Sequence, residues 1–160
     1  MDRRNNPITP AGYSALTEKM RQLYEIERPK VVDIVSWAAG NGDRSENGDY
    51  IYGKKRLREI DREVRYLSGR IKSANVITPG EQPDQTRVYF GATVELADEN
   101  DARRIVTLVG DDEAVPETGR IGWGSPLARA LQRAKTGDVR TVHLPAGAKE
   151  WEVLSIRYES

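Results

Sequence analysis

The sequence of 160 residues contains no cysteine and only one histidine. Without cysteine there is no disulfide framework and no thiolate metal site, and we expect a protein of the reducing cytoplasm. A single histidine, His143, excludes a histidine-rich metal cluster, and no acid–base partner for it stands out in the sequence. The chain also lacks a nucleotide-binding glycine loop and a nucleophile motif, so the common enzyme signatures are absent.

Long hydrophobic runs are missing as well. No run is long enough to span a bilayer, and no apolar stretch follows the charged residues at the start of the chain. We therefore expect neither a membrane segment nor a secretion signal. Hydrophobic residues make up 38% and charged residues 31% of the chain, which is lean for one large globule. Such a composition suits an elongated part with a narrow apolar seam.

The net charge is zero, but the two signs are unevenly distributed. Residues 1–79 hold 15 basic and 11 acidic side chains, whereas residues 80–160 hold 10 and 14. Positive charge is densest in residues 54–72, with 8 basic and 3 acidic side chains. A local excess of positive charge attracts phosphate groups even when the whole chain is neutral.

The first half of the chain carries two helical patterns. Thr9-Pro10 has the form of a helix start, and Pro29 predicts a kink or a shift of the apolar seam near residues 27–30. A second helix is expected from residues 43–46 to about Ala74. The expected seam residues are Tyr13, Leu16, Met20, Leu23, Val31, Ile34, Val35 and Ala38 in the first helix, and Leu57, Ile60, Val64, Leu67, Ile71 and Ala74 in the second. Their spacing of three and four is that of a coiled coil.

The loop between the two helical patterns is short and contains glycine. Residues 40–42 (Gly-Asn-Gly) break the first helix, so the two helices fold back as an antiparallel hairpin. About 30 residues of helix would span roughly 45 Å. Gly48 and Gly53 are poor helix formers, and we expect the second helix to be less stable near the loop than at its base.

Beyond residue 79 the pattern changes to short strands. Residues 78–84 have the composition of a linker, and Ser125-Pro126 predicts a short helix reaching about Ala134. The predicted strands cover residues 87–96, 103–110, 139–144 and 151–158. The fold class expected is α+β, with an N-terminal antiparallel coiled-coil hairpin followed by a small β-rich domain that has one short helix.

The loop end of the hairpin carries two acids, Asp43 and Glu46. Their spacing of three lets both carboxylates converge at a helix start, where they would suit a hard cation such as Mg²⁺. Two ligands are too few for tight binding, so a metal would need further groups from a partner. The same spacing forms a capping box with Asp43 as N-cap, and the residues alone favour this alternative. The two interpretations are compatible, because a capped loop would also hold the carboxylates in place.

A run of basic residues begins eight residues beyond Glu46. The run includes Lys54, Lys55 and Arg58 and continues with Arg62 and Arg65, and we call these five residues the basic stripe. Positions 55, 58, 62 and 65 fall on one helical face beside the seam. The stripe could bind a polyanion such as an RNA backbone. It could equally be a solvated flank balanced by Glu59, Asp61 and Glu63.

Aromatic residues lie near the acids and the basic run. Tyr50 and Tyr52 could stack on a base or a ribose, although tyrosines near a helical hairpin more often pack. Trp37 and Trp123 are expected to be packing residues.

Two long stretches resemble the Gre transcript-cleavage factors of bacteria. One lies in residues 28–50 and includes WAA at 37–39 and GDRSENGDY at 42–50. The other, YGKKRLREID at 52–61, resembles the GreB branch. Downstream, FGA at 90–92, SPLARAL at 125–131 and Gly137-Asp138 resemble the second domain of the family, so the match extends from about Thr9 to Tyr158.

The resemblance implies a division of the chain into two parts. Residues 1–79 would form the coiled-coil hairpin with its acidic tip at 42–47, and residues 80–160 would form an FKBP-like domain. In such factors this domain docks on a coiled coil of the β′ subunit of RNA polymerase, at the rim of the secondary channel. The hairpin enters the channel, and the factor rescues arrested complexes by stimulating cleavage of backtracked RNA.

The resemblance also implies roles for the candidate residues. Asp43 and Glu46 fall on the catalytic acids, which hold Mg²⁺ jointly with the polymerase and bind none stably alone. The basic patch that meets the 3′ segment of the nascent RNA corresponds to Lys54, Lys55, Arg58, Arg62 and Arg65. The protein would have no hydrolase activity alone, would act as a monomer without a membrane, and would reach the nucleoid through RNA polymerase.

Gly48 departs from the family pattern, which usually has alanine there, and Gly53 adds a second flexible point. Two other functions compete with transcript cleavage. A Gre-like regulator could occupy the channel without catalysis, but the Asp-Arg-Ser-Glu tip favours a cleavage factor. A prolyl isomerase or chaperone is a third class, and the FKBP-like fold alone is a weak argument for it.

Overall fold

The computed structural model describes residues 6–42 and 47–159 of the chain. These residues divide into two compact units. One is Ser14–Ser73, and the other joins Met1–Tyr13 to Ala74–Ser160. Among the described residues, no helix combines the length and the apolar character needed to cross a membrane.

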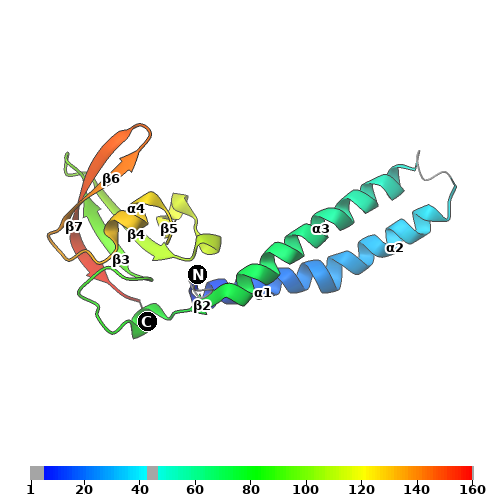
Figure 1. Ribbon diagram of the computed structural model, residues 1–160, viewed down its shortest axis with the longest axis horizontal. Coiled ribbons are helices and arrows are strands. Elements are labelled where there is room, and N and C mark those ends of the chain that lie inside the picture. The colour runs from blue at the N-terminus through cyan, green and yellow to red at the C-terminus, as the bar shows by residue number, and fades with distance from the viewer. Residues whose placement is uncertain (1–5, 43–46, 160) are drawn as a thin grey trace. The chain divides into compact units, whose positions relative to one another are not determined.

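The helical unit is the expected antiparallel hairpin (Figure 1). Its outgoing arm consists of α1 (Pro10–Arg21), the π-helical segment η1 (Gln22–Glu27) and α2 (Arg28–Ala39), and α3 (Gly48–Ser73) forms the returning arm. The buried residues of the seam are Leu16, Leu23 and Ala38 on one arm and Gly53, Ile60 and Leu67 on the other. Ile34 was expected in this seam but is 47% exposed, so that assignment is wrong. The fold class predicted for this half of the chain is confirmed.

A π-helical segment lies directly before Pro29, where the sequence predicted a disturbance. Proline has no amide hydrogen and cannot donate the helical hydrogen bond to the carbonyl of residue 25. The chain widens into η1 just before this position and resumes an α-helix at Arg28. One wide turn rotates the residues that follow, so the seam changes from Leu23 to Val31, Val35 and Ala38.

Gly53 has a packing role that its low helix propensity did not predict. It is buried in α3, and a Cβ atom added there would lie 2.5 Å from Cγ2 of Val35 on α2. The missing side chain therefore lets Val35 pack against the backbone of α3. Gly48, by contrast, is exposed, and a Cβ atom there would meet nothing within 4 Å.

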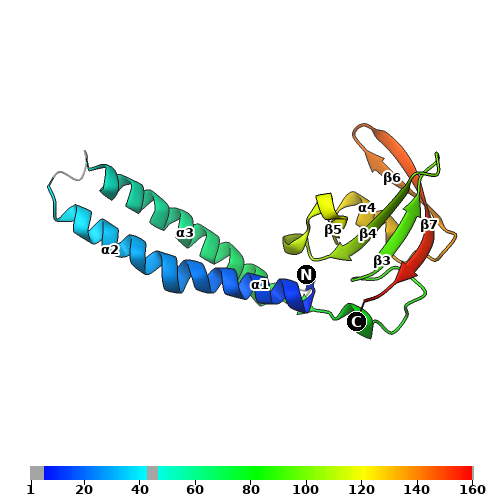
Figure 2. The ribbon, with the colours of Figure 1, turned by 180° about the vertical axis from the view of Figure 1, so that it is seen from behind.

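The second unit is built on a five-stranded sheet with the order β5-β4-β3-β7-β6. The strands are β3 (Thr93–Ala97), β4 (Arg103–Val109), β5 (Arg120–Gly122), β6 (Val139–Leu144) and β7 (Gly147–Arg157). All neighbouring strands are antiparallel except β4 and β5, which are parallel. Figure 2 shows the sheet and the short helix α4 (Pro126–Leu131) from behind. The largest buried side chains of this unit's core include Val94, Leu96, Leu108, Leu131 and Val153.

Helix α4 begins as predicted but ends earlier. The hydroxyl of Ser125 accepts a hydrogen bond from the Ala128 amide at 3.4 Å, and Pro126 occupies the first turn. The helix stops at Leu131, whereas the sequence predicted about Ala134. Arg133 has a φ of 67°, and this left-handed conformation cannot continue a helix.

Two strands differ from their predicted bounds because of turns. The strand expected over 87–96 is formed only from Thr93 onward, since the Ala92 amide bonds back to the Tyr89 carbonyl and Gly91 has a φ of 89°. The last strand begins at Gly147 instead of Trp151, because Gly147, with a φ of 127°, closes a tight hairpin with β6.

A small parallel pair of strands was not predicted at all. β1 (Asn6–Ile8) pairs with β2 (Ala74–Val76), and Asn6 is opposite Ala74. Three-residue strands leave no periodic pattern in the sequence, so only the folded chain reveals them. The 3₁₀ segments η2 (Pro79–Glu81), η3 (Asp111–Glu113) and η4 (Pro116–Thr118) complete this unit.

Two of the three glycines of α3, Gly53 and Gly48, provide a matched pair of substitutions. We expect Gly53→Ala to lower the free energy of unfolding by about 1 kcal/mol, because overpacking costs about 1–3 kcal/mol and helix propensity returns only about 0.5–1 kcal/mol. Gly48→Ala should leave it unchanged or raise it by up to about 0.5 kcal/mol. Urea unfolding followed by the helical circular dichroism signal measures both. Equal effects of the two substitutions would contradict the packing role of Gly53.

Candidate functional site

The loop end of the hairpin is bounded on one side by the last turn of α2. The helix ends at Ala39, and the amide of Gly40 donates to the carbonyl of Trp37 at 3.1 Å. Gly42 follows with a φ of 118°, a conformation that favours glycine. The predicted catalytic acids, Asp43 and Glu46, lie outside the residues that the structure describes.

Asn47 bounds the loop on its other side and ties it to α2. Its side-chain Oδ1 accepts a hydrogen bond from the Tyr50 amide at 3.2 Å, and its carbonyl accepts from the Ile51 amide at 3.0 Å. Asn47 is therefore the N-cap of α3. Its Nδ2 also donates to the carbonyl of Ala38 at 2.8 Å, so one side chain links the start of α3 to the end of α2.

This arrangement corrects two predictions about the second helix. The helix was expected to begin in residues 43–46, but it begins at Gly48. The capping box with Asp43 as N-cap is also wrong for α3, because Asn47 fills that position. The sequence does contain a signal for this cap, since asparagine is among the preferred N-cap residues, but the Asp-x-x-Glu spacing is an equally valid cap pattern four residues earlier.

The two tip acids offer the type of ligand atom that Mg²⁺ prefers, but too few of them to fill its coordination shell. Asp43 and Glu46 supply carboxylate oxygens, the ligands that Mg²⁺ prefers, yet a magnesium ion demands six ligands. Among the described residues, no group of three or more histidine, cysteine, aspartate or glutamate side chains is placed to hold a metal. Any Mg²⁺ at this tip therefore needs donors from outside the chain.

The five residues of the predicted basic stripe all lie on α3. All five of its side chains are exposed, and none takes part in an ion pair with another described residue; they are Lys54, Lys55, Arg58, Arg62 and Arg65. Helical periodicity places them together on the side of α3 turned away from the seam. The stripe is therefore free to bind an external anion.

The acids that could have balanced this stripe pair with other basic residues. Glu59 binds Arg56 at 3.2 Å, and Arg56 also binds Glu27 on the opposite arm at 2.6 Å. Glu63 pairs with Lys19 at 2.9 Å. The acids of α3 thus help to join the two arms. Their ion-pair partners are not residues of the basic stripe, so the alternative of a flank balanced by these acids is wrong.

Asp61 shows the same preference for the opposite arm. The guanidinium of Arg28 donates to it at 2.9 Å. This hydrogen bond lowers the pKa of the Asp61 carboxyl, and Arg65 of the stripe contributes less to the same shift. Arg28 is therefore the main partner of Asp61, and Arg65 keeps its head group available.

Exposed apolar side chains gather near the loop end of the hairpin. Trp37 is 64% exposed and Tyr52 is 70% exposed, and Ile51 beside Tyr52 is also exposed. The prediction that Trp37 packs is therefore wrong. Trp123 does pack, with its ring edge against Phe90 at a centroid distance of 5.7 Å.

An apolar groove of about 360 Å³ lies in the β-rich unit. Side chains from β5, α4, β6 and β7 line it, among them Ile121, Leu127, Val142, Leu144 and Trp151. Arg104 and Lys149 stand at the same groove, and the Lys149 ammonium lies 4.5 Å from the centre of the Trp151 ring. The sequence pattern did not predict this groove, because its walls come from several elements that are separate in the sequence.

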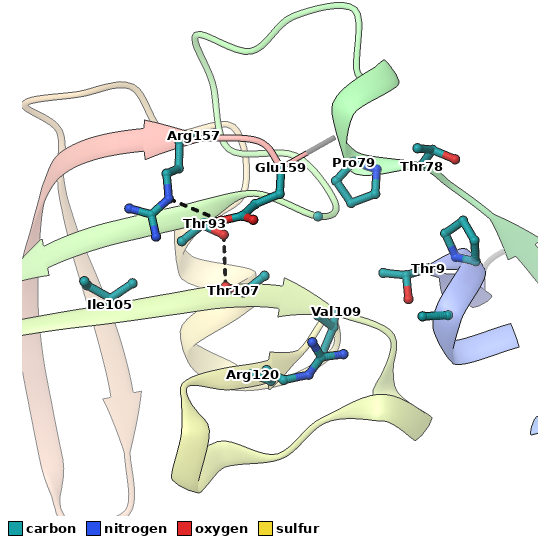
Figure 3. Close-up of a pocket in the computed structure, with 13 residues that line it drawn as sticks. Thr9, Thr78, Pro79, Thr93, Ile105, Thr107, Val109, Arg120, Arg157 and Glu159 are labelled. Carbon is teal, nitrogen blue, oxygen red and sulfur yellow. Dashed lines mark hydrogen bonds and ion pairs between the residues drawn. The ribbon is translucent and has the colours of Figure 1, made fainter. Parts of the chain in front are cut away.

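A larger pocket, of about 550 Å³, opens over β3 and β4 (Figure 3). Its charged groups already have partners within the unit. Arg157 pairs with Glu159 at 3.6 Å, and Arg120 pairs with Glu113 at 3.3 Å. The hydroxyls of Thr93 and Thr107 bond to each other at 3.0 Å. The internal pairing of these groups leaves the basic stripe and the apolar groove as the stronger candidates for binding a partner.

Both halves of the chain match models of one protein family. A model described as "Transcription elongation factor, N-terminal" matches residues 6–76, and one described as "Transcription elongation factor, GreA/GreB, C-term" matches residues 82–158. The matched ranges together cover the hairpin and the β-rich unit.

Whole-chain comparisons agree with these models. Transcription elongation factor GreB of Neisseria meningitidis serogroup B is 49% identical over 153 residues, which cover 96% of this chain and 94% of that protein. The protein of the same name from Yersinia pestis is 44% identical and covers 97% of this chain and 90% of its own length. The crystal structure of GreA factor homolog 1 of Thermus thermophilus aligns with 95% of this chain and 98% of its own, at 24% identity and a TM-score of 0.43. The chain belongs to the GreA/GreB family of transcription elongation factors.

Proposed function

We propose that this chain inserts its helical hairpin into the secondary channel of RNA polymerase and stimulates cleavage of backtracked RNA by the polymerase. RNA polymerase is the partner that membership of an elongation-factor family implies. The observation that carries the proposal is the exposed basic stripe on α3, which forms no ion pair with any residue in the described ranges 6–42 and 47–159. Cleavage chemistry belongs to the polymerase, and the chain contributes groups to it.

Asp43 and Glu46 are the groups that we assign to the cleavage step. Two carboxylates from this chain, added to donors of the polymerase, would complete the shell of a Mg²⁺ that neither partner holds well alone. A metal bound there supplies Lewis-acid stabilisation of the oxygens that enter and leave the phosphorus atom. Asn47 supports this role, because its two hydrogen bonds anchor the residue next to Glu46 to both helices.

The basic stripe is assigned to the 3′ segment of the RNA. Lys54, Lys55, Arg58, Arg62 and Arg65 extend along α3 over about three turns, which matches a contact with several successive phosphates. Like charges on one helix face repel each other, and a bound polyanion relieves that repulsion. Tyr52, whose side chain is exposed, lies between the tip acids and the basic stripe in the sequence.

Docking on the polymerase is assigned to the C-terminal domain. We propose a functional division at residue 79, with the hairpin arm in 1–79 and the docking domain in 80–160, although residues 6–13 and 74–79 pack in the same compact unit as the docking domain. The apolar groove beside Leu144 and Trp151 suits a helix of a coiled coil, such as that of the β′ subunit at the channel rim. All residues that line this groove belong to one chain, so docking requires no second copy, and we propose a monomer.

The tip acids provide the first test of the proposal. Asp43→Asn combined with Glu46→Gln should abolish the stimulation of RNA cleavage in a stalled, backtracked elongation complex, because amides are poorer ligands for Mg²⁺ than carboxylates. Binding to the polymerase should persist, since docking uses the other domain. Cleavage at the wild-type rate by the double variant would refute the tip assignment. No stimulation by the wild-type protein would instead favour a non-catalytic regulator of the channel.

The basic stripe is tested by charge reversal. Lys55→Glu with Arg58→Glu should weaken crosslinking of the protein to RNA and shorten the preferred cleavage product, because the 3′ segment loses its phosphate contacts. Lys30→Glu is the matched control, since Lys30 is exposed on the other arm of the same hairpin. Product lengths that match those of the control would count against the RNA contact.

The groove is tested by two substitutions on one strand. Leu144 lines the groove and is 45% exposed, whereas Val139 is 56% exposed on the same strand and does not line it. Leu144→Glu should weaken polymerase binding by about ten-fold or more, since a charge would enter the centre of an apolar contact. Val139→Glu should change it little. Equal affinities of the two variants in a competition assay would place the docking surface elsewhere.

A further inference from the structure

We propose that Glu113 is a positioning residue for the cleavage reaction. Its carboxylate holds Thr9, the residue from which α1 begins, within the β-rich unit, and we expect this contact to set where the hairpin starts. The inference rests on the proposed function, because the consequence of losing this contact is a misplaced acidic tip.

The side chain of Glu113 is only 8% exposed, and its carboxylate accepts four hydrogen bonds from within the protein. Oε2 accepts from the amide of Thr9 at 2.8 Å and from the amide of Gly110 at 2.9 Å. Oε1 accepts from the hydroxyl of Thr9 at 2.5 Å and from the guanidinium of Arg120 at 3.3 Å. Thr9 is thus bound through both its backbone and its side chain, by a residue 104 positions away.

Thr9 is also the residue from which α1 begins. Its hydroxyl accepts a hydrogen bond from the Gly12 amide at 3.0 Å, and its carbonyl accepts from the Tyr13 amide at 2.9 Å. Glu113 therefore binds the N-cap of α1 at the positive end of the helix, where a carboxylate is favourable. Figure 3 shows Thr9 and Arg120 at the pocket beside this contact.

Two glycines make room for this contact. A Cβ atom on Gly12 would lie 2.5 Å from Oε1 of Glu113, and one on Gly110 would lie 2.8 Å from the carbonyl oxygen of Pro7. The segment that leads into α1 and the turn that carries Glu113 are thus in backbone-level contact. Such close fit leaves the start of α1 little freedom.

The contact between Glu113 and Thr9 lies near one of the places where the chain passes from one unit to the other. Only two crossings join them, one within α1 after Tyr13 and one between Ser73 and Ala74. Pairing of β1 with β2 holds the two crossing segments beside each other, and Glu113 secures the outgoing one. Helix α1 runs from Pro10 to Arg21, so its first residues belong to the β-rich unit and its later ones to the helical unit. A change in the direction of its first turn would therefore change the direction in which the chain enters the hairpin. A tip displaced by about 1 Å can cost about 100-fold in rate, so a loose start of α1 is expected to affect catalysis.

Glu113→Gln and Thr9→Val test the proposal. Glu113→Gln replaces one carboxylate oxygen by an NH₂ group, which would face hydrogen-bond donors. Thr9→Val removes the hydroxyl and keeps the shape of the side chain. Each variant should lower the cleavage rate at saturating factor by about ten-fold or more and change the concentration for half-maximal rate by less than about three-fold, because the docking surface is intact. Glu117→Gln is the charge-matched control in an exposed position of the same unit, and Thr9→Ser should restore the wild-type rate.

A second measurement uses the free protein. The absence of cysteine allows two spin labels to be attached at introduced cysteines, Asp33→Cys on α2 and Arg129→Cys on α4, both at exposed positions. The distance distribution between the labels should broaden in the Glu113→Gln and Thr9→Val backgrounds and stay as in the wild type with Glu117→Gln.

The outcomes separate this inference from the proposed function. Unchanged saturating rates or an unchanged distance distribution would overturn the role of Glu113, as would a defect confined to the half-maximal concentration. If Glu113→Gln does not fold, Thr9→Val with its Thr9→Ser rescue decides the question. Lack of stimulation by the wild-type protein would refute the proposed function, and the distance measurement would still decide whether Glu113 holds α1.

Discussion

Two helices packed along a single seam bury only a narrow stripe of each helix. The small area of this apolar contact is the constraint on which the other contacts of the hairpin depend. The buried residues number few per arm, so the flanks carry charges that pair across the arms. Arg28 with Asp61 and Arg56 with Glu27 are such pairs. Each exposed pair contributes little, about 0–1 kcal/mol, but together they determine which charges remain unpaired. The basic stripe is among the charges that pair with no other described residue, and its availability is a consequence of how the hairpin is held together.

The proposed function would place two demands on the chain. Two carboxylates cannot complete the shell of a Mg²⁺, so on that proposal Asp43 and Glu46 would be part of a metal site whose other ligands come from a partner. The chain would then have to reach the active site of the partner and be held at a fixed position there. The hydrogen bonds of Asn47 link α2 to α3, and those of Glu113 hold Thr9, from which α1 begins. We propose that these two sets of contacts serve the two demands.

Periodicity in the sequence was sufficient for the long elements and insufficient for the short ones. The seam spacing predicted the hairpin, and Pro29 located the seam shift to within a few residues of η1. The three-residue strands β1 and β2 gave no pattern, and the N-cap of α3 was assigned to Asp43 although Asn47 fills it. Gly53 was interpreted as a weak helix former because propensity is a local property, whereas its fit against Val35 depends on the opposite arm.

The sequence by itself determined the α+β class, the positions of Asp43 and Glu46 next to a helix start, and the basic stripe, because all of these follow from spacing along one chain segment. Long motifs within it also carried the resemblance to Gre factors, which the family models confirm. Only the tertiary structure decided that Asp61 and Glu63 of α3 pair with the opposite arm, that Trp37 is exposed and that several separate elements share an apolar groove. It also placed Glu113 on Thr9, 104 residues away. Contacts between distant segments depend on how the chain packs, and no local pattern records that.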